Sequence, residues 1–68
     1  MTRDEHLRWC KQRAHEALNH GGYADAVASM MSDLGKHPET ARSVEVAGFL
    51  MLTVRDHASA MKFIDGFN

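Results

Sequence analysis

The stretch Gly21-Gly22-Tyr23-Ala24-Asp25-Ala26 divides the first half of the chain into two helices. Two adjacent glycines are rare inside a helix, because glycine loses more backbone freedom on folding than any other residue. Apolar residues recur at helical spacing on both sides of the pair: Leu7, Cys10, Ala14, Ala17 and Leu18 before it, and Tyr23, Ala26, Val27, Met30, Met31 and Leu34 after it. The pattern predicts two helices that turn back on each other at Gly21-Gly22.

Cap residues bound these two helices. Thr2 is expected to cap the first helix, with Glu5 at the capping-box spacing. That helix should end near His20. Gly35 is expected to close the second helix in the left-handed conformation that glycine adopts easily.

Two further helices are predicted in the second half. Pro38 can open a third helix, where a missing N–H does no harm, and apolar spacing extends it to Val54. Asp56 is the expected N-cap of a last helix, and Gly66 its C-cap. The apolar face of that helix is predicted to be Ala60, Met61, Ile64 and Phe67. Residues 1–68 are therefore predicted to form one all-α domain of four short antiparallel helices.

A period of 34 residues runs through this pattern, so that Cys10 aligns with Val44, Ala14 with Gly48 and Met30 with Ile64. With the turn glycines, Tyr23, Ala26 and Pro38, the chain resembles the tetratricopeptide repeat. The resemblance implies two helical hairpins whose first helices line a concave groove. A plain four-helix up-and-down bundle remains the alternative, because Asp33, Arg55 and His57 depart from the repeat pattern.

A second resemblance is to short, uncharacterised bacteriophage and prophage proteins. The strings that carry it are His6-Leu7-x-Trp9-Cys10-Lys11-x-Arg13-Ala14, Ser29-Met30-x-Ser32-Asp33-Leu34-x-Lys36-His37-Pro38-Glu39-Thr40 and Phe63-Ile64-x-Gly66-Phe67-Asn68. It implies a viral origin and carries no activity.

Composition excludes several classes of protein. Eight Lys and Arg residues against nine Asp and Glu give a net charge of −1, which disfavours a nucleic-acid binder. The longest apolar run, Phe49 to Leu52, is too short to span a membrane. The N-terminal residues do not resemble a signal peptide, and a lone cysteine fits a reducing compartment. We therefore expect a cytoplasmic protein without a membrane segment.

No motif indicates catalysis, a cofactor or a metal. His6 and Cys10 lie four residues apart and could form half of a zinc site, but a full site needs three or four ligands. Cys10 falls on the apolar stripe of its helix, where a thiol is expected to be buried and inert. We therefore expect a binding protein with no catalytic residue, no cofactor and no metal.

The resemblance to tetratricopeptide hairpins predicts a partner-binding groove. Its positions in this chain are Arg8, Lys11, His15 and Asn19 on the first helix and Arg42, Glu45, Phe49 and Thr53 on the third. This mostly basic and polar set suits an acidic or C-terminal segment of a protein partner. Trp9 has two interpretations, either as a cover over the core edge with Arg13 packed on its ring, or as an interface anchor.

The predicted function is a phage-type protein-interaction module that binds and modulates a host or phage protein, such as an inhibitor of a host factor. The alternative is a nucleic-acid-associated accessory protein, suggested by basic residues along the first helix. A homodimer is also predicted. Phe49 and Phe63 fall outside the apolar stripes, and a chain of this size buries only about 60% of its unfolded surface.

Overall fold

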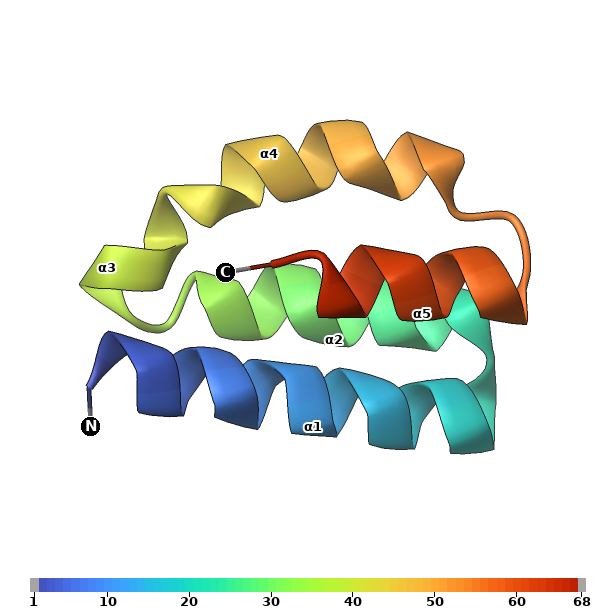
Figure 1. Ribbon diagram of the computed structural model, residues 1–68, viewed down its shortest axis with the longest axis horizontal. Helices are drawn as coiled ribbons and strands as arrows, with labels where there is room; N and C mark the ends of the chain where they lie inside the picture. Colours follow the sequence, from blue (N-terminus) through green and yellow to red (C-terminus); the bar gives the residue numbers. More distant parts are fainter. Residues whose placement is uncertain (1, 68) are drawn as a thin grey trace.

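The computed structural model describes residues 2–67 and folds them into five α-helices and one 3-10 helix, with no strand among these residues (Figure 1). The elements are α1 Arg3–Gly21, α2 Tyr23–Leu34, α3 Pro38–Ala41, α4 Ser43–Leu50, η1 Met51–Thr53 and α5 His57–Asp65. The predicted all-α class is confirmed for this part of the chain. Met1 and Asn68, which end the predicted domain and one of the phage-like strings, lie outside the described residues.

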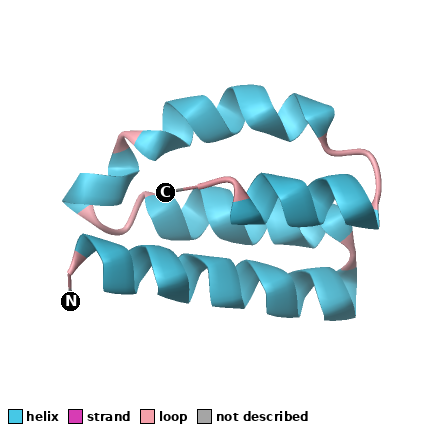
Figure 2. Ribbon diagram, viewed as in Figure 1, coloured by secondary structure: helices cyan, strands magenta, loops and turns pink. Residues whose placement is uncertain are grey.

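The helices run side by side and are joined by short loops (Figure 2). Figure 1 shows α1 and α4 at opposite edges of the molecule, with α2 and α5 between them. α1 packs chiefly on α2, α5 packs across both, and α4 packs on α2. The resemblance to repeat hairpins implies that the first helix of each hairpin lies beside the other. The structure instead separates α1 from α4.

The α1–α2 hairpin follows the predicted signals. The Thr2 hydroxyl accepts a hydrogen bond from the Glu5 N–H at 3.1 Å, and the Thr2 N–H donates to the Glu5 carboxylate at 3.2 Å. Gly22 has φ 93° and ψ −177°, a conformation that is essentially limited to glycine. The capping box and the glycine turn are therefore confirmed, with α1 ending one residue later than expected.

The predicted left-handed Gly35 is wrong. Gly35 has φ −72° and ψ −11°, within the right-handed helical region. The Thr40 hydroxyl donates to the Leu34 carbonyl at 2.7 Å, so a side chain satisfies the end of α2. The Leu34 carbonyl therefore has a hydrogen-bond partner without a left-handed turn at Gly35.

The single helix predicted from Pro38 to Val54 is divided into α3, α4 and η1. Pro38 does begin α3, and His37 caps it by accepting the Glu39 N–H on its ring Nδ1. Arg42, between α3 and α4, keeps helical angles of φ −63° and ψ −27°, so the chain bends there without leaving the helical region. Thr40 is fully buried and holds α3 against the end of α2, while α4 continues along a different course.

The last helix, α5, is rotated relative to the prediction. Asp56 caps it through reciprocal hydrogen bonds with Ser59, as expected. Phe63, predicted to face away from the core, is only 4% exposed and packs edge-on against Phe67 at 5.3 Å. Met61, predicted to be buried, is 40% exposed. Residues 60, 63, 64 and 67 form the buried stripe at helical spacing, and two phenylalanines fill more of the core than one phenylalanine and a methionine would.

The core lies between α1, α2 and α5, with a small contribution from α4. Its members are Leu7, Cys10, Ala14, Leu18, Ala26, Met30, Leu34, Ala47, Ala60, Phe63, Ile64 and Phe67. Most of the predicted stripe residues of α1 and α2 belong to it, whereas Tyr23 is 45% exposed. Within residues 2–67, no helix is both long enough and apolar enough to cross a bilayer.

Candidate functional site

The structure divides the predicted groove residues between two surfaces. Arg8, Lys11, His15 and Asn19 lie on α1. Arg42 directly precedes α4, and Glu45 and Phe49 lie on α4. Because α5 packs across α1 and α2, it separates the α1 residues from Glu45 and Phe49 (Figure 1), whereas Arg42 lies beside Arg3 of α1. The two surfaces are therefore considered separately.

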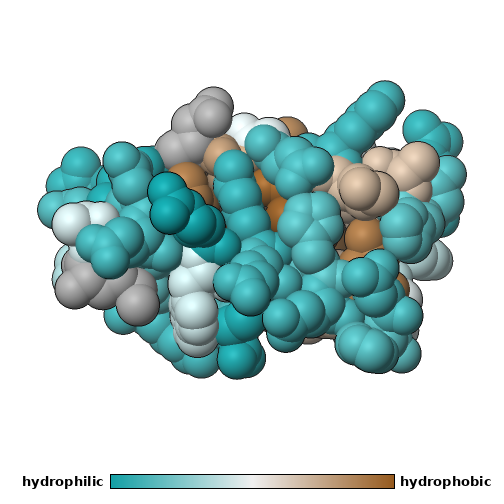
Figure 3. Space-filling view, turned by 60° about the horizontal axis from the view of Figure 1, so that its bottom comes forward, coloured by the Kyte–Doolittle hydropathy of each residue, from teal (hydrophilic) through white to brown (hydrophobic). Residues whose placement is uncertain are grey.

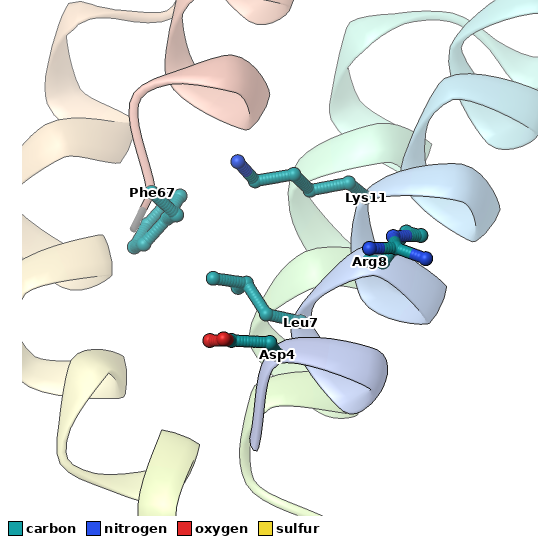
Figure 4. A pocket seen from close by; sticks show the side chains of 5 residues that line it. All are labelled: Asp4, Leu7, Arg8, Lys11 and Phe67. Atoms are coloured by element: carbon teal, nitrogen blue, oxygen red, sulfur yellow. The ribbon is translucent and has the colours of Figure 1, made fainter. Parts of the chain in front are cut away.

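A hollow lies between α1 and the segment after α5. We call it the α1 hollow and define it by its lining residues, Asp4, Leu7, Arg8, Lys11 and Phe67. Figure 4 shows Asp4, Leu7 and Lys11 extending from successive turns of α1 toward Phe67, with Arg8 staying closer to the helix. Phe67 was predicted only as a core residue, and its position beside two basic residues could not be inferred from sequence spacing.

The charges of the α1 hollow are arranged along the helix. Asp4 stands at one end and Lys11 at the other, with Leu7 between them (Figure 4). Leu7 and Phe67 are 7% and 6% exposed, so they form a floor beneath the charged side chains. Within residues 2–67, neither Arg8 nor Lys11 forms an ion pair, whereas Asp4 pairs with Arg3 at 3.3 Å. Two cations beside the hollow thus remain available to an acidic group.

The rest of the α1 surface is hydrophilic. Figure 3 shows that hydrophilic residues cover most of this face of the molecule, with apolar atoms visible between them and at the upper right. His15 Nε2 lies 2.9 Å from a carboxylate oxygen of Asp65, which links α1 to the end of α5. Asn19 is exposed near the end of α1. Neither residue lines the α1 hollow.

Trp9 belongs to a different cluster, built around Asp33. The Arg13 guanidinium carbon lies 4.8 Å from the Trp9 ring centroid, and the Lys36 amine 5.6 Å from it. The same two cations donate to the Asp33 carboxylate, at 2.7 Å from Arg13 and 3.0 Å from Lys36. The predicted packing of Arg13 over the Trp9 ring is therefore confirmed. Arg13 and Lys36 are therefore both engaged by Asp33 and Trp9 within the fold.

Asp33 is the polar residue whose importance sequence reasoning missed. It is 1% exposed, and its backbone carbonyl accepts a hydrogen bond from the buried ring of His6 at 2.8 Å. Burial alone raises the pKa of the Asp33 carboxyl, but the hydrogen bonds from Arg13 and Lys36 outweigh it, and the pKa falls below its ordinary value. The i, i+3 spacing of Asp33 and Lys36 in the sequence could have indicated their ion pair. No sequence pattern indicated that Arg13 would also lie beside Asp33.

The second surface is on α4. We define the α4 face as Glu45, Gly48, Phe49 and Leu52, which together line an open hollow. Phe49 is 77% exposed and Leu52 is 79% exposed. The predicted exposure of Phe49 is confirmed. Arg42 lies away from this face, beside Arg3, Pro38 and Glu39.

Cys10 and His6, the two residues of the hypothetical zinc half-site, are both buried. Cys10 is fully buried, and burial, followed by the nearby Asp33 charge, raises the pKa of its thiol. His6, its partner in the hypothetical half-site, is directed to the Asp33 carbonyl. Among residues 2–67, no three His, Cys, Asp or Glu side chains are placed to hold a metal ion.

Comparison with protein-family models, curated proteins and solved structures finds no match to this chain.

Proposed function

We propose that this protein is a non-catalytic protein-interaction module that binds an acidic segment of a partner protein at the α1 hollow. The carrying observation is that Arg8 and Lys11, neither of them in an ion pair within the described chain, stand beside a hollow with an apolar floor. A partner carboxylate beside these cations would make charge-assisted hydrogen bonds, which are about twice as strong as neutral ones.

The order of charges favours one class of segment. Asp4 repels an acidic group at its end of the hollow, and Lys11 attracts one at the other end. A short apolar group between them would lie over Leu7 and Phe67. The preferred segment therefore carries an acidic residue next to an apolar one, and it lies in one direction along α1.

The mixed character of the hollow also suits a partner that binds reversibly. Interfaces of non-obligate complexes are about as polar as the rest of a protein surface. The resemblance to short bacteriophage proteins supports a host or phage protein as the partner, whose activity would change on binding. Nucleic acid is less well supported, because the cations Arg13 and Lys36 are occupied by Asp33.

For the architecture, we propose the four-helix antiparallel bundle rather than a stack of two tetratricopeptide hairpins. The support is the separation of α1 from α4 by α2 and α5. A stack of repeats would place the two first helices together. The bundle also leaves α1 free to present its own hollow without α4.

Selection from a random-peptide library on the immobilised protein tests this function. We expect the selected peptides to carry an acidic residue beside an apolar one. Lys11→Glu should lose them, because it puts a negative charge at the end of the hollow that attracts acids. Arg42→Glu is the matched control, since it makes the same charge change outside the hollow and should retain binding.

Peptides without acidic enrichment, or equal loss in both variants, would contradict the α1 hollow as the binding site. Far-UV circular dichroism of each variant shows whether it keeps its helices. The same pair of variants, used to capture proteins from host lysate, then separates a partner bound at the hollow from one bound elsewhere.

A further inference from the structure

His37 and His6 form a stacked pair between the start of α3 and the start of α1. The centroids of the two rings are 5.1 Å apart, and the ring planes are inclined by 30°. His6 is 5% exposed, and its ring also lies 5.4 Å from that of Trp9. His37 directly precedes the four-residue helix α3. The ring of His37 therefore joins the beginning of α3 to the first turns of α1.

The hydrogen bonds of the two rings fix which nitrogen carries a proton. His6 Nε2 lies 2.8 Å from the backbone carbonyl oxygen of Asp33. Because a carbonyl oxygen only accepts, His6 Nε2 carries a proton. The Glu39 backbone N–H donates to His37 Nδ1 at 3.1 Å, so His37 Nδ1 carries none. His37 is therefore neutral when it caps α3, and its proton is on Nε2.

A second proton on the His37 ring removes the cap of α3. An imidazolium ring donates at both nitrogens and accepts at neither, so it cannot accept the Glu39 N–H. Helices as short as α3 do not persist in water without outside contacts. Loss of a side-chain N-cap shifts the ratio of formed to unformed helix by about fivefold. The contact that remains is the Thr40 hydroxyl, which donates to the Leu34 carbonyl at 2.7 Å.

The charges around His37 do not offset an added proton. The charged side chains on the elements that pack around it are Arg3 of α1, Asp33 and Lys36 at the end of α2, Glu39 of α3 and Arg42 after α3. The Asp33 carboxylate already accepts hydrogen bonds from two cations. Glu39 shares its hollow with two arginines. Both anions are therefore matched by cations before His37 gains a charge.

We propose that His37 is a proton-sensitive latch for α3. At neutral pH its uncharged ring stacks on His6 and caps α3. When the ring takes up a proton, the cap is lost, His6 faces a positive charge, and α3 detaches from the start of α1. Histidine ordinarily changes its charge between about pH 5 and pH 8, so the latch opens in this range as the pH falls. No residue that lines the α1 hollow belongs to α3 or to the loop before it, so the proposal is independent of the proposed function.

Nuclear magnetic resonance spectra of the wild type, recorded from about pH 7.5 to about pH 5, test the latch. The ring nitrogen shifts of His37 report its tautomer and its protonation, and the Cα shifts of residues 38–41 report the helical state of α3. Asp33 stays charged throughout, because its pKa lies below its ordinary value. We expect the His37 proton on Nε2 at neutral pH. The helical Cα shifts of α3 should then decrease with the same midpoint as the protonation of His37.

The variant His37→Asn separates the cap from the proton. Asparagine is a favoured N-cap residue, and its side-chain oxygen accepts a backbone N–H without any titratable group. We expect the Cα shifts of α3 in this variant to stay helical over the whole pH range. His20→Gln is the matched control, because it removes an exposed histidine at the other end of α1. It should keep the pH response of the wild type.

Three results would overturn the proposal. The first is a set of α3 shifts that does not change while His37 takes up its proton. The second is a His37 ring that carries its proton on Nδ1 at neutral pH, since such a ring cannot cap α3. The third is an equal acid response in His37→Asn and the wild type, which would assign the change to another group, such as His6.

Discussion

Asp33 illustrates how a single polar residue can connect several parts of a small fold. Its carboxylate accepts hydrogen bonds from Arg13 of α1 and from Lys36 in the loop after α2, and both cations also lie against Trp9. Its backbone carbonyl accepts a hydrogen bond from the His6 ring. The carboxylate is therefore central to the contact between α1 and the end of α2.

We expect Asp33→Asn to lower the free energy of unfolding at pH 7 by about 1–3 kcal/mol, since the charged acceptor of two hydrogen bonds is lost. The pH dependence follows from the lowered pKa of Asp33. The stabilisation is fully present above the ordinary aspartate pKa of about 3.9, and it is lost as pH falls from there through the folded-state value.

Urea denaturation at a series of pH values measures both effects. The difference in stability between wild type and Asp33→Asn should shrink on acidification. Asp25→Asn, at an exposed position in the first turn of α2, is the control and should change stability by less than about 1 kcal/mol. A difference from wild type that is independent of pH would mean that the ion pairs of Asp33 do not stabilise the fold.

At the scale of the helices, glycine has opposite roles at two positions. Gly22 has a positive φ of 93°, which other residues adopt only with strain, and it makes the turn between α1 and α2. Gly48 lies inside α4 with open space where a side chain would stand. The backbone conformation at Gly22 therefore favours glycine, whereas the helical position of Gly48 would favour a residue with a side chain.

Gly22→Ala should therefore destabilise the protein by about 1–3 kcal/mol, because the turn forces alanine into a conformation that it disfavours. Gly48→Ala should stabilise α4 by up to about 1 kcal/mol, through helix propensity alone. Thermal unfolding of dilute protein, where self-association is weakest, compares the two variants. If Gly48→Ala destabilised the protein as much as Gly22→Ala, the open space at Gly48 inside α4 would be contradicted.

At the scale of the whole molecule, the homodimer predicted from the sequence would link self-association to stability. A dimer that binds only the folded state raises the apparent stability as concentration rises. We therefore expect the melting temperature of the wild type to increase with protein concentration. A wild-type melting temperature independent of concentration would argue that folding and self-association are separate, or that no dimer forms.

The sequence determined the local features of this protein, since these depend on neighbouring residues. The capping box at Thr2, the glycine turn, the start of α3 at Pro38 and the Asp56 cap were all predictable, as was the burial of Cys10. Each depends on a backbone preference or a hydrogen bond within a few residues.

Only the tertiary structure decided how the helices face one another. The burial of Phe63, the pairing of Arg13 with Asp33 and the approach of Phe67 to Lys11 all join residues far apart in the sequence. The 34-residue period aligned Met30 with Ile64, and both are fully buried, but it also aligned the buried Ala14 with Gly48, which has open space where a side chain would stand. The period also did not fix which helices are adjacent. Packing of α5 across α1 and α2 separated the α1 part of the predicted groove from its α4 part, and it buried Phe63 of α5 and Phe67, just after α5, in the core.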